Sequence, residues 1–347
     1  MVLYAHWQVK GVKMVIDKNV AYLGVIDPDH IPEDMDEIKT AGCTSITLTV
    51  NELDWWYYRT PRRVAVKEAH ERGMKVFLDF HGFGIFASPI PSAVYPMYNP
   101  DKTQVFTDGR RTEKACPNDA EFEKWFKDIA KQVIEEFRPD GLFWDEPAFS
   151  PCDTYPKSWA CFCKNCQEKF RSRFGRQMPK ELTDEVQKFR QDSLLEFLKR
   201  LLKFGKEAGG KTSILCMMPW SRGANSNRGW YGIMDWEPFI QIPEMDIFAT
   251  DPYWIHGGDW NYFTDNTREA VELCKKYKKP CQLWVQAVWI KPGKEPEVKR
   301  TIIEAAKMGA DMIAVWSYKS EPGAHVLDFG GDHKLVWQMV REGFKEI

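Results

Sequence analysis

Two adjacent carboxylates, Asp145 and Glu146, stand at the end of a short apolar run in the sequence DGLFWDEP, residues 140–147. The run has the length and composition of a buried strand, and Pro147 closes it. A strand of a parallel α/β fold that ends on acidic side chains presents them at the edge where such folds bind ligands. Asp145 and Glu146 are therefore the first candidates for general acid or base chemistry.

Three thiols follow soon afterwards, at Cys161, Cys163 and Cys166, in the pattern C-x-C-x2-C. This spacing is typical of metal ligands, and the nearest upstream cysteines that could complete a set of four are Cys152 and Cys116. Four thiolates form a closed tetrahedral zinc site, which supports structure because it leaves no position for water. The alternative is that these thiols are unconnected free cysteines in a loop.

Eight β-rich apolar runs could position these residues, and helical patterns lie between them. The runs cover residues 21–26, 44–50, 75–82, 140–147, 212–219, 245–254, 281–290 and 311–319. Eight such units predict one (β/α)8 TIM barrel that spans residues 1–347, with long insertions in the loops after strands 3 and 4, residues 83–118 and 148–182. A doubly wound open sheet is the alternative, although no glycine-rich phosphate fingerprint follows the first strand.

The carboxyl ends of the strands surround the active site of such a barrel. Besides Asp145 and Glu146, the candidate catalytic acid there is Asp251, after the sixth strand. The predicted substrate contacts, all near strand ends, are Asn51, Trp56, Asp79, His81, Tyr253, Trp254, Gln286, Trp289, Trp316, Tyr318 and Glu321. Many carboxylates and aromatic rings with few arginines favour a neutral carbohydrate over a phosphorylated sugar.

The bulk composition excludes several other classes of protein. With a formal net charge of −2, the chain lacks the basic field that nucleic acid or an anionic membrane would require. The N-terminus has no cleavable signal pattern, and no apolar run reaches the roughly 18 residues of a spanning helix. The prediction is a cytoplasmic protein without an organic cofactor, in which several of the nine cysteines are reduced core residues.

A family resemblance rests on the segments GRRTEKACPNDAEFEKW and CFCKNCQEKFRSRFG and on the strand between them that ends in Glu146. Together these resemble the zinc-containing, thermophile-type β-galactosidases and the related hypothetical glycosyl hydrolases of the retaining-glycosidase clan. TDPYW and GADMIAVWSYKSEPGA are also similar to family segments, so the resemblance covers roughly residues 105–325. It implies a TIM barrel, zinc held by Cys116, Cys161, Cys163 and Cys166, Glu146 as the general acid/base, and a homo-oligomer.

Two departures from the family pattern bear on the mechanism. Asp145 stands where the family has an asparagine before its acid/base. Gln286 stands at the end of strand 7, where the family has its nucleophilic carboxylate. An amide is a poor nucleophile, so the family's double-displacement mechanism cannot simply be transferred.

Glycoside hydrolysis needs a carboxylic acid to protonate the leaving oxygen and a second group to meet the oxocarbenium-like transition state. Glu146 is the candidate acid. The second group is Asp251, Glu321, or the substrate's own 2-acetamido group oriented by Asp145, as in hexosaminidases. The last mechanism requires a bend in the backbone, because adjacent residues of a regular strand point to opposite faces.

The sequence thus predicts a glycoside hydrolase acting on β-linked sugars or short oligosaccharides. A non-catalytic carbohydrate-binding barrel is one alternative, and Gln286 is the residue that favours it. A metal-dependent barrel enzyme is another, but the HxH of amidohydrolases is absent from strand 1. The rim carries only His30, His81, His256 and His325, without an evident carboxylate ladder for two metals.

Overall fold

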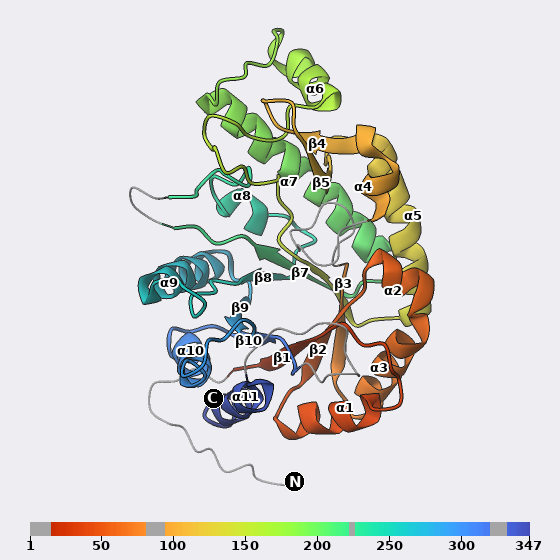
Figure 1. The fold of residues 1–347 in the computed structure, drawn as a ribbon, viewed down its shortest axis with the longest axis vertical. Helices are drawn as coiled ribbons and strands as arrows, with labels where there is room; N and C mark the ends of the chain where they lie inside the picture. Colours follow the sequence, from red (N-terminus) through yellow and green to blue (C-terminus); the bar gives the residue numbers. More distant parts are fainter. Residues whose placement is uncertain (1–14, 81–93, 222–225, 320–331) are drawn as a thin grey trace.

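The computed structural model describes residues 15–80, 94–221, 226–319 and 332–347, and it contains a closed barrel of eight parallel strands (Figure 1). Around the barrel the strands follow the order β1-β10-β9-β8-β7-β6-β3-β2. They are β1 (Asp17–Tyr22), β2 (Ser45–Thr49), β3 (Lys75–Asp79), β6 (Gly141–Trp144), β7 (Thr212–Met217), β8 (Ile247–Thr250), β9 (Cys281–Gln286) and β10 (Met312–Trp316). The predicted (β/α)8 barrel is confirmed.

Nearly all strand residues are buried, because the barrel lumen covers one face of each strand and helices cover the other. Side chains alternate between the two faces: Ile214 and Cys216 of β7 belong to the cluster in the lumen, whereas Leu215 packs outward. Phe143 and Trp284 meet inside the lumen with ring centroids 5.0 Å apart. A ligand therefore has to bind above the lumen, among the loops at the carboxyl ends of the strands.

The first strand lies earlier in the chain than the apolar run at residues 21–26 predicts, because β1 begins at the polar residue Asp17. Its carboxylate accepts hydrogen bonds from the hydroxyls of Thr44 (2.6 Å) and Ser45 (2.8 Å) on the neighbouring segment. Asn19 is held in the same way, accepting from Thr47 at 2.9 Å. A strand can bury polar residues when they have such hydrogen-bond partners. A search for apolar runs alone therefore misses the beginning of this strand.

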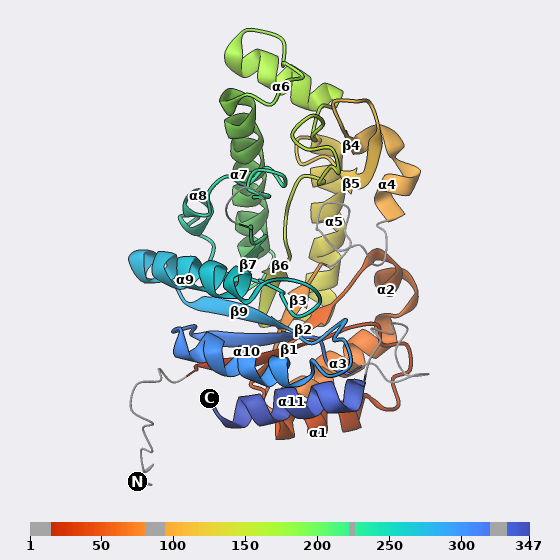
Figure 2. The ribbon, with the colours of Figure 1, turned by 60° about the vertical axis from the view of Figure 1, so that its left-hand side comes forward.

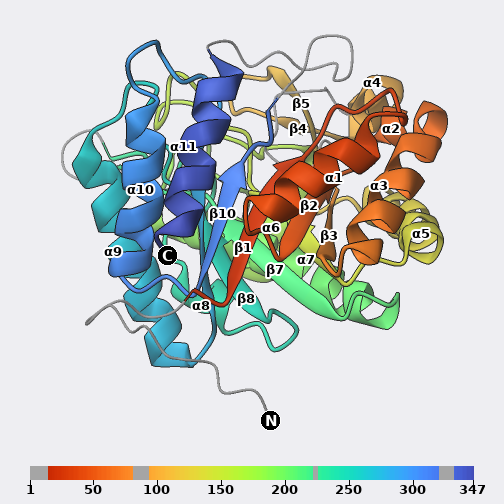
Figure 3. The same cartoon turned by 90° about the horizontal axis from the view of Figure 1, so that it is seen from below.

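Most helices surround the barrel on its outside (Figure 3), and α4 and α6 lie in loop insertions. The helices are α1 (Ile31–Thr40), α2 (Glu52–Tyr57), α3 (Arg59–Glu71), α4 (Val94–Tyr98), α5 (Ala120–Phe137), α6 (Lys164–Phe174), α7 (Asp184–Glu207), α8 (Glu237–Ile240), α9 (Trp260–Tyr277), α10 (Pro296–Lys307) and α11 (His333–Lys345). The side chains of Asp119, Thr183, Asp259 and Asp332 accept backbone N–H bonds in the first turns of α5, α7, α9 and α11. No helix in the described ranges is long and apolar enough to cross a membrane.

The loops after β3 and β6 carry the two long insertions that the sequence predicts. The first contains α4, a short 3-10 turn (Pro100–Lys102) and the antiparallel pair β4 (Thr103–Val105) and β5 (Arg111–Ala115). The second contains α6. In Figure 2 both insertions lie beside the upper ends of α5 and α7, away from β1 and β2. An isolated bridge between Phe106 and Ala160 joins the two insertions.

Candidate active site

Glu146 occupies an unusual backbone conformation two residues beyond β6. Its φ of +40° lies in the left-handed region, which costs a non-glycine residue about 1–2 kcal/mol, and no helix end accounts for it. The backbone N–H of Glu146 donates to the carbonyl of Cys216 on β7 at 3.1 Å, which fixes the bend. The backbone departs from a regular strand at Glu146, as the sequence argument requires, and the charges of Asp145 and Glu146 both act on Asp251 and Tyr253. Glu146 lines the pocket described below, whereas Asp145 is not among its lining residues.

Asp251 directly follows β8, and it lines the same pocket as Glu146. The thiol of Cys216, on the strand between them, donates to Asp251 Oδ1 across 4.0 Å. Burial raises the pKa of Asp251 well above its usual range, and the charges of Glu146 and Asp145 raise it further. The structure thus brings together the three acids that the sequence marked as catalytic candidates.

A pocket of about 580 Å³ opens above Glu146 and Asp251. Trp220, Tyr253 and Tyr262 contribute ring surfaces to its wall, and polar groups come from the loop after β8 and from α9. Burial raises the pKa of Tyr253 and Tyr262, as do the negative charges of the pocket, so both phenols remain hydrogen-bond donors at neutral pH. Rings and convergent polar groups at the mouth of a barrel suit a polyhydroxylated ligand.

Two residues whose pKa values respond to the acids, Lys114 and Tyr231, do not lie at the ends of barrel strands, so a search of strand ends does not identify them. Lys114 is only 6% exposed although it lies in the insertion strand β5. Burial lowers the pKa of its ammonium group, and the negative charge of Glu146 opposes that shift. Tyr231 lies in the segment between β7 and α8, where burial and the charges of Glu146 and Asp251 raise its pKa to about 12. Neither position carries a sequence motif, so only the folded chain reveals them.

Gln286, the residue at the position of the missing nucleophile, is 1% exposed and holds the loop after β8. Its Oε1 accepts from the backbone N–H of Ile255 at 2.8 Å and of His256 at 3.4 Å, and its Nε2 donates to the carbonyl of Val288 at 2.9 Å. The described residues that line the pocket do not include Gln286. Its amide atoms are therefore engaged in supporting the wall.

Three further residues that the sequence predicts as substrate contacts form hydrogen bonds with other parts of the protein. The hydroxyl of Tyr318 donates to Asp34 (2.9 Å) and Glu37 (2.7 Å) on α1, outside the barrel. Trp254 donates from Nε1 to Thr301 of α10 at 3.1 Å. Asn51 caps α2 through its side-chain oxygen. A position near the end of a strand thus does not guarantee that a side chain turns toward the pocket.

The remaining residues predicted to contact substrate differ in their solvent exposure. Asp79 is fully buried at the end of β3, and Trp316 lies half-buried beside Trp284, with ring centroids 5.8 Å apart. Trp56 and Trp289 are 43% and 49% exposed. Tyr253 is the predicted contact that lines the pocket described above. His81 and Glu321 lie outside the described residues.

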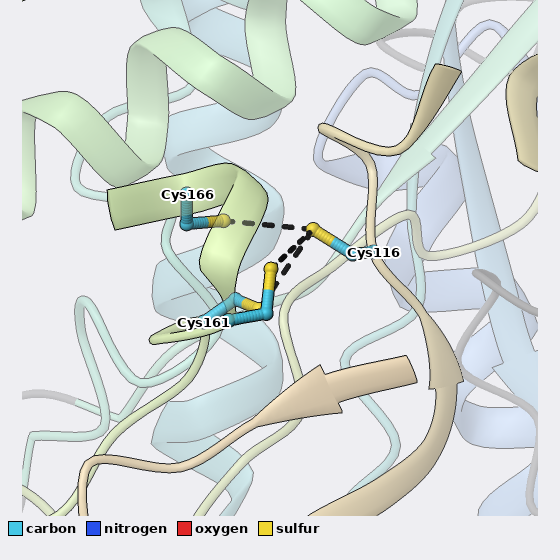
Figure 4. Close-up of side chains that lie close together, drawn as sticks. Cys116, Cys161 and Cys166 are labelled. Atoms are coloured by element: carbon cyan, nitrogen blue, oxygen red, sulfur yellow. Dashed lines mark hydrogen bonds between the residues drawn. The ribbon is translucent and has the colours of Figure 1, made fainter. Parts of the chain in front are cut away.

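Four buried cysteines, Cys116, Cys161, Cys163 and Cys166, gather between the two insertions. Figure 4 labels Cys116, Cys161 and Cys166 of this set. The sulfur of Cys116 lies 3.5 to 3.7 Å from the other three. Tetrahedral coordination with metal–sulfur bonds near 2.3 Å would place the sulfurs about 3.8 Å apart, so the set fits a metal ion. Asn118 donates to Cys116 Sγ from its backbone (3.4 Å) and to Cys166 Sγ from its side chain (3.2 Å), as outer partners of thiolate ligands do.

Cys152, the other candidate for the fourth ligand, lies apart from this cluster. Its sulfur accepts from the guanidinium of Arg110 at 3.3 Å and lies 3.2 Å from the hydroxyl of Thr154. The cysteine that joins the C-x-C-x2-C segment is therefore Cys116, which follows β5.

No protein-family model and no curated protein sequence match this chain. Several solved structures do match this chain. The endo-β-1,4-mannanase of Thermotoga petrophila aligns with a TM-score of 0.59 at 12% identity, over 97% of this chain and 77% of that one. The endo-1,4-β-mannanase of Rhizomucor miehei gives 0.63 at 10% identity, over 96% of each chain. A Bacteroides thetaiotaomicron protein assigned as an α-L-fucosidase gives 0.58 at 10% identity, over 99% of each. At such identities the likeness shows a shared barrel fold.

The arrangement of the acids limits the chemistry that the pocket can support. A carboxylic acid that is buried close to further negative charge, as Asp251 is, retains its proton to higher pH than an isolated one. Such a group can donate that proton to a leaving oxygen. The tyrosine hydroxyls and the ring surfaces beside it can bind and orient the ligand.

Proposed function

We propose that this chain is a glycoside hydrolase that acts on β-linked sugars or short oligosaccharides, with Glu146 as the general acid/base. The observation that carries the proposal is the position of Glu146. It lies at the carboxyl end of the fourth barrel strand, in a strained conformation, and its carboxyl group faces both a ring-lined pocket and a second carboxyl group. Strain held at a polar pocket is typical of catalytic residues.

Two comparisons support the same reaction class. The barrel is shared with two endo-mannanases and with a protein assigned as a fucosidase, all of which bear names of carbohydrate-cleaving enzymes. The cysteine segments resemble those of zinc-containing β-galactosidases, and this resemblance favours a β-galactoside as the substrate. The metal that the cysteine cluster would hold is then zinc.

In the proposed reaction, Glu146 donates a proton to the glycosidic oxygen as the bond to the anomeric carbon breaks. Tyr253 and Tyr262 hydrogen-bond to sugar hydroxyls, and Trp220 provides an apolar surface for the ring. The group on the other side of the anomeric carbon is either an enzyme carboxylate, for which Asp251 is the candidate, or an acetamido group of the substrate itself.

A second candidate function, hydrolysis of 2-acetamido sugars, follows from the bend at Glu146. The left-handed conformation of Glu146 interrupts the strand, and the charge of Asp145 acts on Asp251 of the pocket, so Asp145 is the residue that would orient the acetamido group. Gln286 supplies no carboxylate opposite, and a substrate-assisted reaction needs none there.

The zinc assignment predicts about one zinc per purified chain, with sulfur ligands near 2.3 Å in X-ray absorption. Cys163→Ser should abolish stoichiometric zinc and lower the melting temperature by several degrees, because a closed site contributes binding energy to folding. Cys152→Ser is the matched control and should retain the metal, since Cys152 lies outside the cluster. Zinc lost from the Cys152 variant and kept by the Cys163 variant would refute the assignment.

The direct test of the hydrolase proposal is a screen of aryl glycosides that covers galactosides, glucosides, fucosides and 2-acetamido sugars. We expect turnover of at least one β-glycoside, and NMR of the first product anomer should give the stereochemical outcome. Saturable sugar binding without turnover of any glycoside would instead favour the non-catalytic carbohydrate-binding barrel.

A further inference from the structure

His256 lies in a tight turn after β8, where it is exposed and lines the pocket. The backbone N–H groups of Gly257 (3.3 Å) and Gly258 (2.7 Å) both donate to the carbonyl of Trp254 and close the turn. A Cβ atom at Gly258 would lie 2.9 Å from Cα of Trp254, so the close approach of the two backbone segments requires glycine. The turn therefore presents an imidazole ring to the pocket from a backbone that is held in place.

Gln286 holds this imidazole ring by one of its two nitrogens. Oε1 of Gln286 lies 3.2 Å from Nδ1 of His256, and it also accepts from the backbone N–H groups of Ile255 (2.8 Å) and His256 (3.4 Å). Nε2 of Gln286 donates to the carbonyl of Val288 at 2.9 Å. A flipped amide would place its NH2 group against two N–H donors and its oxygen against a carbonyl. The hydrogen-bond network therefore assigns Oε1 as the atom that faces His256.

This orientation of the amide determines the tautomer of His256. An amide oxygen only accepts hydrogen bonds, so Nδ1 of the imidazole must carry the proton. In the neutral ring the other nitrogen, Nε2, then has a free lone pair and acts as an acceptor. Nε2 has no hydrogen-bond partner among the residues that the structure describes. A ligand in the pocket can therefore donate a hydrogen bond to it.

Several other polar groups of this wall are donors or are already engaged. The phenols of Tyr253 and Tyr262 are donors at neutral pH because their pKa values are raised. Asn266 bonds the backbone of Trp220 through both atoms of its amide, and Asp259 caps the first turn of α9. A sugar hydroxyl group both donates and accepts hydrogen bonds. An uncharged acceptor beside phenol donors therefore complements a neutral sugar.

We propose that His256 is a substrate-binding residue, whose Nε2 accepts a hydrogen bond from one hydroxyl group of a bound β-galactoside, and that Gln286 is the positioning residue that fixes its tautomer. The identity of the sugar rests on the proposed function. The tautomer does not, since it follows from the hydrogen bonds of Gln286.

The inference gives a chemical reason for an amide at position 286. A carboxylate there would stabilise the charged imidazolium form of His256, in which both ring nitrogens are donors. The neutral amide of Gln286 supplies the same acceptor to Nδ1 without adding a negative charge. A glutamine in place of a glutamate thus preserves an acceptor at Nε2 of His256.

The first test is the tautomer of His256, observed by NMR in protein with 15N-labelled histidine. The chain has seven histidines, and the His256 signals are those missing from the spectra of His256→Asn and His256→Gln. In the neutral ring we expect a proton on Nδ1 and none on Nε2. Gln286→Met should lose this preference, because it removes the acceptor. His70 is the internal control, since its Nε2 lies 3.0 Å from Oδ2 of Asp140 and should carry the proton. A wild-type His256 with its proton on Nε2 would overturn the inference.

The second test is the affinity for methyl 1-thio-β-galactoside, whose sulfur linkage resists hydrolysis, and for its monodeoxy analogues, measured by calorimetry. In the wild type, the analogue that lacks the partner hydroxyl should bind about tenfold more weakly than the parent. His256→Asn keeps a donor toward Gln286 but lacks Nε2. It should bind the parent about tenfold more weakly and no longer distinguish that analogue. His256→Gln, whose side-chain oxygen can occupy the place of Nε2, should recover part of the discrimination. His70→Asn should bind like the wild type.

Two results of the second test contradict the inference. One is a wild-type protein that does not bind the thiogalactoside, and the other is a folded His256→Asn variant that discriminates among the analogues as the wild type does. Neither measurement needs turnover, so this inference and the hydrolase proposal fail separately. A protein with the expected tautomer and the expected discrimination that cleaves no glycoside would refute only the proposed hydrolysis.

Discussion

Glu146→Gln is expected to reduce the turnover of natural glycosides by on the order of 10²- to 10⁴-fold while binding is largely retained. The amide has nearly the shape of the acid, but it cannot supply the proton that a poor leaving group needs. Glycosides with activated aryl leaving groups should lose much less activity, because such leaving groups depart without proton transfer. The measurement is kcat/KM for an alkyl or natural glycoside and for an aryl glycoside of the same sugar, with binding followed by calorimetry.

The control for this substitution is Glu135→Gln, which removes the same carboxylate from an exposed position on α5. It should leave both substrates unaffected. If Glu146→Gln weakens hydrolysis of both substrate types equally, proton donation is not the role of Glu146. The strained backbone would then need another explanation, such as substrate orientation by that side chain.

The barrel could be predicted because its signals are local. Seven of the eight apolar runs overlap closely with observed strands, and the eighth, at the start of the chain, is displaced because Asp17 and Asn19 are buried by hydrogen bonding. The cysteine cluster could be predicted for a similar reason, since three of its members lie in one short loop. The choice of Cys116 over Cys152 came from the family resemblance, and the structure places Cys116 within 4 Å of the other sulfurs.

The contents of the pocket could be predicted only in part, because the end of a strand does not determine which way a side chain turns. Tyr318 and Gln286 stand at strand ends, yet both are engaged in bonds to other parts of the scaffold. Lys114 approaches Glu146 from an insertion that has no fixed place in a barrel. The meeting of Asp251 and Glu146 in one pocket depends on strand order and on the backbone at Glu146, and neither is encoded in local spacing.

Asp145→Asn distinguishes the two substrate classes, and its expected effect is large only for a 2-acetamido sugar. In a substrate-assisted reaction the acetamido oxygen attacks the anomeric carbon, and a carboxylate at Asp145 stabilises the positive charge that develops on the acetamido nitrogen. Loss of such preorganised stabilisation typically lowers kcat by about 10²- to 10³-fold. A thiazoline analogue of the cyclic intermediate should also inhibit strongly, since it resembles a species bound only near the transition state.

The opposite result would indicate an enzyme that does not use its substrate's acetamido group. In that case the thiazoline should be ineffective, Asp145→Asn should have a mild effect, and hydrolysis of simple β-galactosides should continue.

Gln286→Glu tests the remaining alternative, a barrel that binds carbohydrate without cleaving it. A carboxylate there would face the carbonyl of Val288 and lose the bond that the amide now donates, so we expect lower stability and no gain in activity. If that substitution creates hydrolysis in an otherwise inert protein, the native chain binds carbohydrate without cleaving it, because the only chemical group it lacked was the carboxylate opposite Glu146.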